Sequence, residues 1–405
     1  MGKALQFEPR AAEFPSLVQR VNGQPLAYLD NAATTQMPQL VLDAMRRFES
    51  HDRANIHRGV HTLSQRATDA FEAARATLKT FVGAGAEHEL VFTSGTTEAL
   101  NLLANGLSLR EGDQIIVSCL EHHANLVPWQ IAARRSGAAL LILRPDAQGR
   151  LHADDLAPLL SERPRIFALT ACANATGERP PYEALLSLAA EAGALTVLDA
   201  AQAVAHAVPD LSALDCDFMA FSGHKMYGPM GIGVLAGRRA ALDQLAPLRY
   251  GGDMVQWVDY MQASFAELPA RLEGGTPNVA GAVGMAAAAT FIDQTCRADI
   301  DAHVEALRAH AVAGLEALPD ITVLSPRCTR TAIVSFVAEG VHPHDIGTVL
   351  DEQGLAVRTG HHCAMPLIDH LGLGPTTRAS FALYNSHEEV ERLVAGVAGA
   401  LELLR

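Results

Sequence analysis

The segment LTVLDAAQAVAHAVPDLSALDCDFMAFSGHK, residues 195–225, decides the fold class. It contains two short apolar runs, 195–199 and 217–221; the first ends in Asp199, and the second is followed by Ser222-Gly-His-Lys225. Short runs that are almost continuously apolar are typical of strands buried on both faces of a parallel sheet. Because ligands bind beyond the carboxyl ends of such strands, we expect Asp199 and Lys225 to lie together at one edge of a sheet.

The same alternation continues on both sides of this segment. Most of the apolar runs are separated by stretches with helical periodicity, which indicates an α/β fold with a mainly parallel sheet covered by helices on both faces. The pattern predicts seven strands, at 89–93, 114–118, 139–143, 165–170, 195–199, 217–221 and 233–236, and helices at 97–105, 127–135 and 182–191.

The C-terminal part of the chain has a different pattern. It predicts helices at 279–297, 303–318, 344–352 and 388–404 and a strand at 333–337. We therefore expect two domains: a large ligand-binding domain over residues 27–290 and a smaller α/β domain over residues 291–405, joined by the N-terminal segment 1–26.

The composition argues against several classes of protein. The chain has 31 Lys and Arg against 45 Asp and Glu, and the resulting net charge of -14 disfavours binding to nucleic acids and to anionic membranes. Hydrophobic residues make up 49% of the chain, enough for a large core, and no apolar run approaches the roughly 20 residues of a membrane span. The first residues lack the apolar core of a secretory signal, and the six cysteines are dispersed. We therefore expect reduced thiols and a cytoplasmic protein.

A lysine at the end of a strand can lose its proton and form a Schiff base with an aldehyde. Taken alone, the turn that contains Lys225 is equally compatible with a solvated surface lysine. Asp199 favours the first interpretation, because pyridoxal phosphate acts as an electron sink while its ring nitrogen is protonated, and a carboxylate can maintain that proton. The alternative for Asp199 is an ordinary aspartate in a turn after a strand. Together the two residues predict pyridoxal 5'-phosphate as the cofactor.

Residues 93–98, Thr-Ser-Gly-Thr-Thr-Glu, place hydroxyls and free N–H groups where a strand meets a helix. Such a junction can bind phosphate, although a simple helix N-cap explains it equally well. His122 follows the next strand and could stack on a planar ring. The alternative is a metal site, but the sequence lacks an H-E-x-x-H motif and its 17 histidines produce pairs by chance, so we expect no metal. The histidines concerned are His57 with His61, His122 with His123, His342 with His344, and His361 with His362.

Cys363 is the candidate nucleophile among the six cysteines. It lies in Arg358-Thr-Gly-His-His-Cys-Ala-Met-Pro, a loop whose nearby potential cations favour the thiolate. The other cysteines are expected to be small buried residues. Arg358 and Arg378 are candidates for a bidentate grip on a substrate carboxylate; the alternative for each is a structural ion pair.

Six segments, in this order, resemble a single family from about residue 20 to the C-terminus. The chain resembles the group II, Suf-type cysteine desulfurases, which are related to selenocysteine lyases and belong to the class V aminotransferase superfamily with pyridoxal-phosphate fold type I. The segments are Tyr28-Leu-Asp-Asn-Ala-Ala, Thr93-Ser-Gly-Thr-Thr-Glu, Glu121-His-His-Ala-Asn-Leu-Val-Pro-Trp, Ser222-Gly-His-Lys-Met-Tyr-Gly-Pro, Glu273-Gly-Gly-Thr-Pro-Asn and Arg358-Thr-Gly-His-His-Cys-Ala-Met-Pro.

The resemblance implies a role for each candidate residue. Lys225 would form the Schiff base, Asp199 would pair with the pyridine nitrogen, and His122 would stack on the ring. The implied phosphate ligands are Thr96, Thr97, Ser222 and His224, with Thr276 reaching across from the other subunit of a homodimer. Gln202 and Asn174 would lie near the phenolic oxygen or the substrate, Arg378 and Arg358 would bind the substrate, and Cys363 would carry a persulfide.

The implied reaction converts L-cysteine to L-alanine. The sulfur passes to Cys363 and then to a Suf-type acceptor protein for iron–sulfur cluster assembly. The nearest alternative is a selenocysteine lyase acting on L-selenocysteine; the alternative from another class is a non-enzymatic metal-binding or interaction protein. Two positions depart from the family pattern: Ser94 stands where many relatives have Arg, and Ala200 where Gly is usual. Neither removes a catalytic group, although Ser94 is expected to affect how a partner protein docks.

Overall fold

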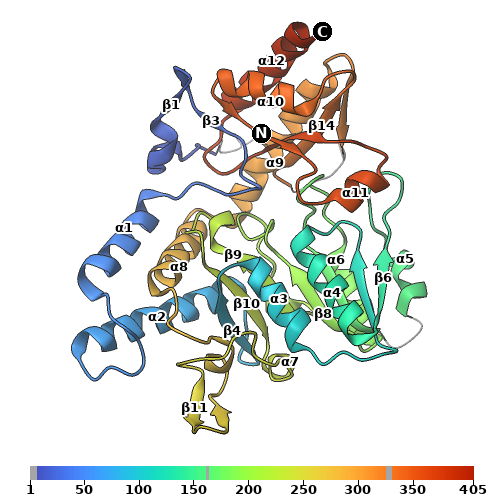
Figure 1. Cartoon of the computed structure of the whole chain (residues 1–405). Helices are drawn as coiled ribbons and strands as arrows, with labels where there is room; N and C mark the ends of the chain where they lie inside the picture. Colours follow the sequence, from blue (N-terminus) through green and yellow to red (C-terminus); the bar gives the residue numbers. More distant parts are fainter. Residues whose placement is uncertain (1–6, 161–163, 325–330) are drawn as a thin grey trace, which may run out of the picture.

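The computed structural model describes residues 7–160, 164–324 and 331–405. The predicted α/β fold with a mainly parallel seven-stranded sheet is confirmed (Figure 1). The order across the sheet is β4-β10-β9-β8-β7-β5-β6, and β10 is the one strand of this sheet that runs antiparallel to its neighbours. The strands are β4 (His88–Thr93), β5 (Gln114–Ser118), β6 (Ala139–Leu143), β7 (Pro164–Thr170), β8 (Leu195–Asp199), β9 (Phe218–Ser222) and β10 (Gly233–Arg238).

Helices cover both faces of the large sheet, as its strands require because their residues are buried on both sides. Alternate strand residues enter two separate cores: Leu198 and Phe221 belong to one, and Val197 and Ala220 to the other. The first core includes α2 (Thr62–Phe81), α6 (Tyr182–Glu191) and α8 (Val279–Gln294). The second includes α3 (Thr96–Gly106), α4 (Val127–Ser136) and α7 (Arg239–Leu242).

The C-terminal part of the chain forms an antiparallel sheet in the order β13-β14-β17-β16. This sheet and three helices surround a third core. The elements are β13 (Ile321–Leu324), β14 (Ile333–Ala338), β16 (Arg358–Gly360), β17 (Thr376–Ser380), α9 (Arg297–Glu316), α10 (Pro343–Glu352) and α12 (His387–Leu404).

The N-terminal part of the chain reaches this smaller sheet. Strand β3 (Ala27–Tyr28) pairs in parallel with β15 (Leu355–Ala356), and Asp30 forms a bridge with Ser380. We therefore propose two domains that divide near residue 290, with the N-terminal segment attached to the smaller domain up to about residue 30. This proposed attachment extends a few residues beyond the predicted segment 1–26.

The junction of α8 and α9 differs from the predicted helices 279–297 and 303–318. The two helices meet at an angle of 82°, and Cys296 at the junction has a φ of 61°. The second helix begins at Arg297, with Asp299 in its first turn, where a carboxylate favours the helix. Among the described residues no single helix is long and apolar enough to cross a membrane; α8 and α9 meet that criterion only as a bent pair, and α8 is largely buried.

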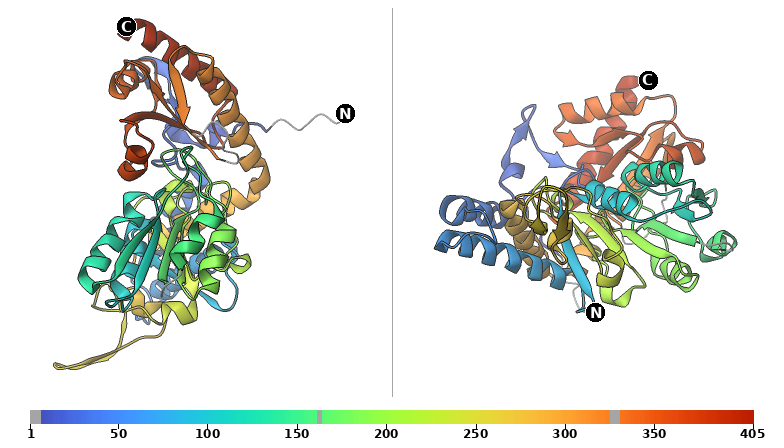
Figure 2. Two further views of the ribbon diagram at one scale, coloured as in Figure 1. Left: turned by 90° about the vertical axis from the view of Figure 1, so that its right-hand side faces the viewer. Right: turned by 60° about the horizontal axis from the view of Figure 1, so that its bottom comes forward.

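Several elements were not predicted from the sequence. One of them, the hairpin of β11 and β12, projects from the body of the protein (Figure 2). Its apolar side chains are exposed, including Trp257, Tyr260 and Met261, so no burial pattern marks it. The unpredicted elements include β1 (Arg20–Val21), β2 (Gln24–Pro25), α1 (Gln39–Arg47), α2, α5 (Ala153–Leu156), β11 (Val255–Val258), β12 (Ala263–Phe265) and α11 (Met365–His370).

Two glycines allow the start of α3 to approach β10 and Ser222 closely. A Cβ atom on Gly233 would lie 2.5 Å from the Cα atom of Gly95. Gly95 has a φ of 154°, and its own Cβ would approach the Ser222 Oγ to 3.3 Å. Larger residues would therefore push the N-terminus of α3 away from Ser222.

We expect Gly233→Ala to lower the stability by about 1–3 kcal/mol, because the added methyl group overpacks a buried contact. The midpoint of urea unfolding should fall accordingly. Gly252→Ala is the matched control, since a Cβ there meets no atom within 4 Å, and its midpoint should stay close to that of the parent. Equal midpoints for Gly233→Ala and the parent would contradict the prediction.

Candidate functional site

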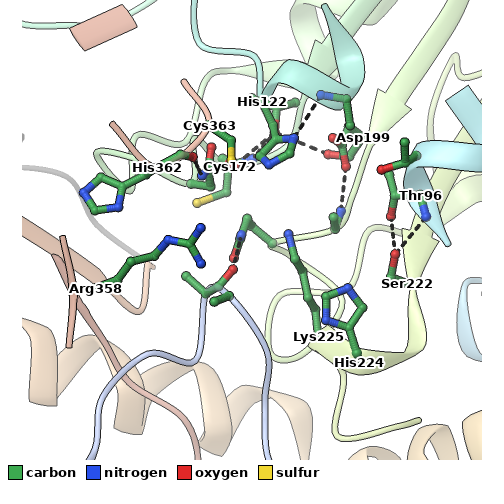
Figure 3. Close-up of a pocket in the computed structure, with 18 of the residues that line it drawn as sticks. Thr96, His122, Cys172, Asp199, Ser222, His224, Lys225, Arg358, His362 and Cys363 are labelled. Atoms are coloured by element: carbon green, nitrogen blue, oxygen red, sulfur yellow. Dashed lines mark hydrogen bonds between the residues drawn. The ribbon is translucent and has the colours of Figure 1, made fainter. Parts of the chain in front are cut away.

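A cavity of about 180 Å³ lies at the carboxyl ends of the large sheet, where residues of the smaller sheet face it (Figure 3). It brings together every predicted site residue except Thr276, which is exposed elsewhere on this chain. The predicted residues that line it are Thr96, Thr97, His122, Asn174, Asp199, Gln202, Ser222, His224, Lys225, Arg358, Cys363 and Arg378.

Lys225 and Asp199 come from neighbouring strands, as the sequence pattern predicts. Lys225 ends a single helical turn (Gly223–Lys225) directly after β9, and Asp199 ends β8. Burial lowers the pKa of Lys225, which favours the uncharged amine, while the charge of Asp199 acts in the opposite direction. The Asp199 carboxylate accepts a hydrogen bond from the Ala201 N–H at 2.9 Å. The site thus offers an amine and a carboxylate on one wall of the cavity.

The N-terminus of α3 forms another wall. Ser222 Oγ accepts a hydrogen bond from the Thr96 N–H at 2.8 Å and lies 2.7 Å from the Thr96 hydroxyl. The first hydrogen bond within the helix runs from the Ala99 N–H to the Gly95 carbonyl, so the N–H groups of Thr97 and Glu98 precede the helical ladder. Free N–H groups and the helix dipole favour an anion at this position.

His122 and His224 face the same cavity as neutral rings. Burial, reinforced by the charge of Lys225, lowers the pKa of each imidazole to about 4. His122 Nδ1 accepts a hydrogen bond from the Ala124 N–H at 3.0 Å, which leaves the proton of the neutral ring on Nε2. The carbonyl of His224 accepts hydrogen bonds from Thr34 and Thr35, which hold its turn in place.

Next to His122 lies the buried carboxyl group of Glu121, which the sequence suggested only as part of the alternative metal site Glu121-His122-His123. Glu121 accepts hydrogen bonds from the Ser118 hydroxyl at 2.5 Å, the Asn125 amide at 2.6 Å and the Thr170 N–H at 2.9 Å. Burial raises its pKa to about 8. Because Thr170 pairs with Asp199 in the sheet, this group links the His122 turn to the Asp199 strand.

Arg378 is almost fully buried and makes a structural ion pair, the alternative considered from the sequence, but its partner Asp30 was not predicted. Its Nη2 lies 2.9 Å from the Asp30 carboxylate, and its Nη1 donates to the Asn174 carbonyl at 2.9 Å. Its Nε and the Asn174 Oδ1 are buried with no hydrogen-bond partner among the described residues. Arg358 also points into the cavity. The site therefore has unsatisfied polar atoms available for a ligand. The sequence signal that could have identified Asp30 as a site residue is the segment Tyr28-Leu-Asp-Asn-Ala-Ala.

Cys363 lies on a loop of the smaller sheet that faces Lys225 and His122 (Figure 3). His362 and Cys363 have φ values of 52° and 58°, a conformation that costs energy for residues other than glycine. A second thiol, that of Cys172, lines the cavity too. Burial raises the pKa of Cys172 to about 11; its position beside the cavity was not predicted.

The alternative metal site was also tested against the geometry. Within residues 7–160, 164–324 and 331–405, no three His, Cys, Asp or Glu side chains are grouped so that they could hold a metal ion. Among the histidines considered for a metal, His123 contacts the Cys363 loop, His122 faces the cavity, and His57 pairs with Glu72.

Comparison with known proteins supports one family. The Aminotransferase class-V family model matches residues 27–393. A probable cysteine desulfurase of Vibrio cholerae is 45% identical over 403 residues, covering 99% of this chain and 100% of the relative. The crystal structure of a cysteine desulfurase from Escherichia coli has a TM-score of 0.89 and 39% identity, and covers 98% of each chain. A cysteine desulfurase from Thermococcus onnurineus has a TM-score of 0.90 and 37% identity, and covers 96% of this chain and 98% of its own. From the match over most of its length, this chain belongs to the class V aminotransferase family.

Proposed function

We propose that the protein is a cysteine desulfurase that converts L-cysteine to L-alanine and transfers the sulfur to Cys363. The observation that carries this proposal is a single cavity lined by Lys225, Asp199 and Cys363. Relatives named cysteine desulfurases, at 45% and 44% identity over nearly the whole chain, support it.

The cavity fits pyridoxal 5'-phosphate as the proposed cofactor. The N-terminus of α3, with Thr96, Thr97 and Ser222, would hold the phosphate, and His224 would add a further contact. Lys225 would hold the aldehyde carbon, and Asp199 would face the ring nitrogen. His122 would lie against the ring face, with Gln202 and Asn174 at its edge. The unpartnered Asn174 Oδ1 supports a polar ligand at that edge.

The cofactor, when bound, supplies an electron sink for the charge that develops at the substrate α-carbon. Burial lowers the pKa of Lys225, so its free amine is suited to take the α-proton and later to return a proton to the product. Burial raises the pKa of Asp199, and its hydrogen bond from Ala201 opposes this. A carboxylate in this position would stabilise the protonated ring nitrogen of the cofactor.

Cys363 would accept the sulfur. A bond forms between Cys363 Sγ and the substrate sulfur while the substrate Cβ–S bond breaks, and the carbon skeleton takes up a proton to become L-alanine. One L-cysteine and one thiol thus give one L-alanine and one persulfide, with no other oxidant or reductant. The unpartnered Nε of Arg378 is available to the substrate carboxylate, and Arg358 provides a second cation beside it.

The finer assignments are proposals of the same kind. We propose a cytoplasmic, Suf-type group II enzyme that hands its sulfur to an acceptor protein for iron–sulfur cluster assembly. The short segment between Cys363 and α11, which begins at Met365, supports the group II assignment. We also propose a homodimer in which Thr276 completes the phosphate site of the partner. The exposed apolar side chains of the β11–β12 hairpin support an interface.

Lys225→Ala should abolish both the yellow colour of the purified protein and the formation of alanine from L-cysteine, because Lys225 is the one lysine among the described residues that line the cavity. The visible absorbance of the bound cofactor measures the first effect, and an alanine assay measures the second. Lys79→Ala is the matched control, since Lys79 pairs with Glu89 away from the cavity, and it should leave both unchanged. A colourless parent protein that carries zinc would contradict the proposed function.

Cys363→Ser should keep the colour and still bind L-cysteine, but alanine formation should fall by orders of magnitude, because a hydroxyl is a much poorer sulfur acceptor than a thiolate. The expectation that the other cysteines are buried is wrong for Cys296, which is exposed at the bend between α8 and α9, while Cys328 lies outside the described residues. Cys296→Ala should behave like the parent. Peptide mapping of the sulfur-loaded enzyme should find the persulfide on Cys363; persulfide on another cysteine would overturn the assignment. Retained activity of Cys363→Ser toward L-selenocysteine alone would favour the lyase alternative for that substrate.

The proposed dimer predicts that Thr276→Ala lowers the affinity for pyridoxal 5'-phosphate without changing the assembly. Sedimentation at working concentration should give a dimer for both the parent and the variant, and a cofactor titration should give a higher Kd for the variant. An active, cofactor-loaded monomer would show that the site does not need a second subunit.

A further inference from the structure

One histidine beside the cavity has no part in the proposed chemistry, although it contacts the loop that carries Cys363. We propose that His123 is a positioning residue that clamps the Cys363 loop to the large domain through both its main chain and its imidazole ring. The inference rests on the proposed function only in naming Cys363 as the residue that accepts sulfur.

The main chain of His123 makes the first contact. Its N–H donates a hydrogen bond to the carbonyl of Cys363 at 2.8 Å. One residue earlier in the loop, the His362 carbonyl accepts a hydrogen bond from the Asn174 amide at 2.5 Å. Two consecutive carbonyls of a small-domain loop are therefore held by donors of the large domain.

The ring of His123 makes the second contact. Its Nε2 accepts a hydrogen bond from the Met365 N–H at 3.2 Å. An acceptor nitrogen carries no proton, so the neutral ring has its proton on Nδ1. His123 thus holds the residues at 363 and 365, on both sides of Ala364, and Met365 is where α11 begins.

The backbone conformation explains why the loop needs such a clamp. His362 and Cys363 both lie in the left-handed region, with φ values of 52° and 58°. Such a conformation is costly for residues other than glycine and persists where the surrounding structure determines it strongly. The contacts from His123 and Asn174 supply that constraint, and without the His123 ring the loop can relax to other conformations.

The same turn also determines the position of His122. His122 is the N-cap of the 3-10 turn His123–Asn125, and its Nδ1 accepts a hydrogen bond from the Ala124 N–H. His122 faces the cavity and His123 faces the Cys363 loop, so this turn fixes the sulfur-accepting loop relative to the ring-stacking histidine. A clamp of this kind keeps the thiol pointing into the cavity and limits its reach toward solvent.

The test compares His123→Ala with His123→Gln, whose amide oxygen can replace Nε2 as an acceptor. For His123→Ala we expect kcat for alanine formation to fall about tenfold or more, since small misplacements of a reacting group have effects of this size. The KM for L-cysteine should change little, because Arg378 and Arg358 are untouched. His123→Gln should recover most of the loss.

Two measurements on the loop itself do not depend on turnover. Hydrogen exchange of the Met365 amide and alkylation of Cys363 by iodoacetamide, both followed by mass spectrometry, should become several-fold faster in His123→Ala and return toward the parent in His123→Gln. Alkylation of the exposed Cys296 in the same sample is the internal control and should not change. His152→Ala, at an exposed histidine that pairs with Asp146, is the control for loss of an imidazole.

Unchanged exchange and alkylation in His123→Ala would overturn the proposal, whatever the enzyme's activity. So would a glutamine variant as impaired as the alanine variant, or a loss of cofactor colour in His123→Ala, which would indicate a general structural role. If the loop measurements change as expected but the parent forms no alanine, the clamp stands and the proposed function fails.

Discussion

The cost of burying charge governs how this chain is arranged around its cavity. Lys225, Asp199 and Arg378 all lie where burial disfavours their charged forms, and a buried charge without a partner is strongly destabilising. The fold meets this cost with one local and one distant partner: Ala201 donates to Asp199 two residues before it, and Asp30 pairs with Arg378 at 2.9 Å from the other end of the chain. These partners stabilise the buried charges but leave specific atoms without a hydrogen bond, such as Arg378 Nε. A ligand in the cavity can therefore still bind to them.

The seven-stranded sheet was predictable because the sequence signal of each strand is local. Each strand from β4 to β10 is a short apolar run, and parallel packing places the residues that follow such runs at one edge, which is why Asp199, Lys225, His122 and the start of α3 could be assigned to a common site. The hairpin at β11 and β12 gives no such signal, because its side chains are exposed. The bend at Cys296 depends on a backbone conformation that composition does not reveal.

The contacts between distant segments were beyond sequence reasoning. Asp30 lies 348 residues from Arg378 along the chain, and no periodicity connects an N-terminal loop with a C-terminal strand. Cys172 was expected to be an ordinary core cysteine, and it is buried, but it also lines the cavity. In both cases the residue type was visible in the sequence, and only the tertiary fold decides what it touches.

Two thiols in one cavity raise the question of which of them can react, and their surroundings give a physical answer. The Cys172 sulfur is enclosed by the Gly177 carbonyl and the Thr331 hydroxyl, each at 3.7 Å, and burial raises its pKa to about 11. Near neutral pH it therefore stays a thiol, which is a weak nucleophile. Cys363 is partly exposed and lines the cavity on a loop held by His123 and Asn174, so a ligand in the cavity can reach its sulfur. The same chemical group is thus kept inert by burial at one position and left accessible at the other.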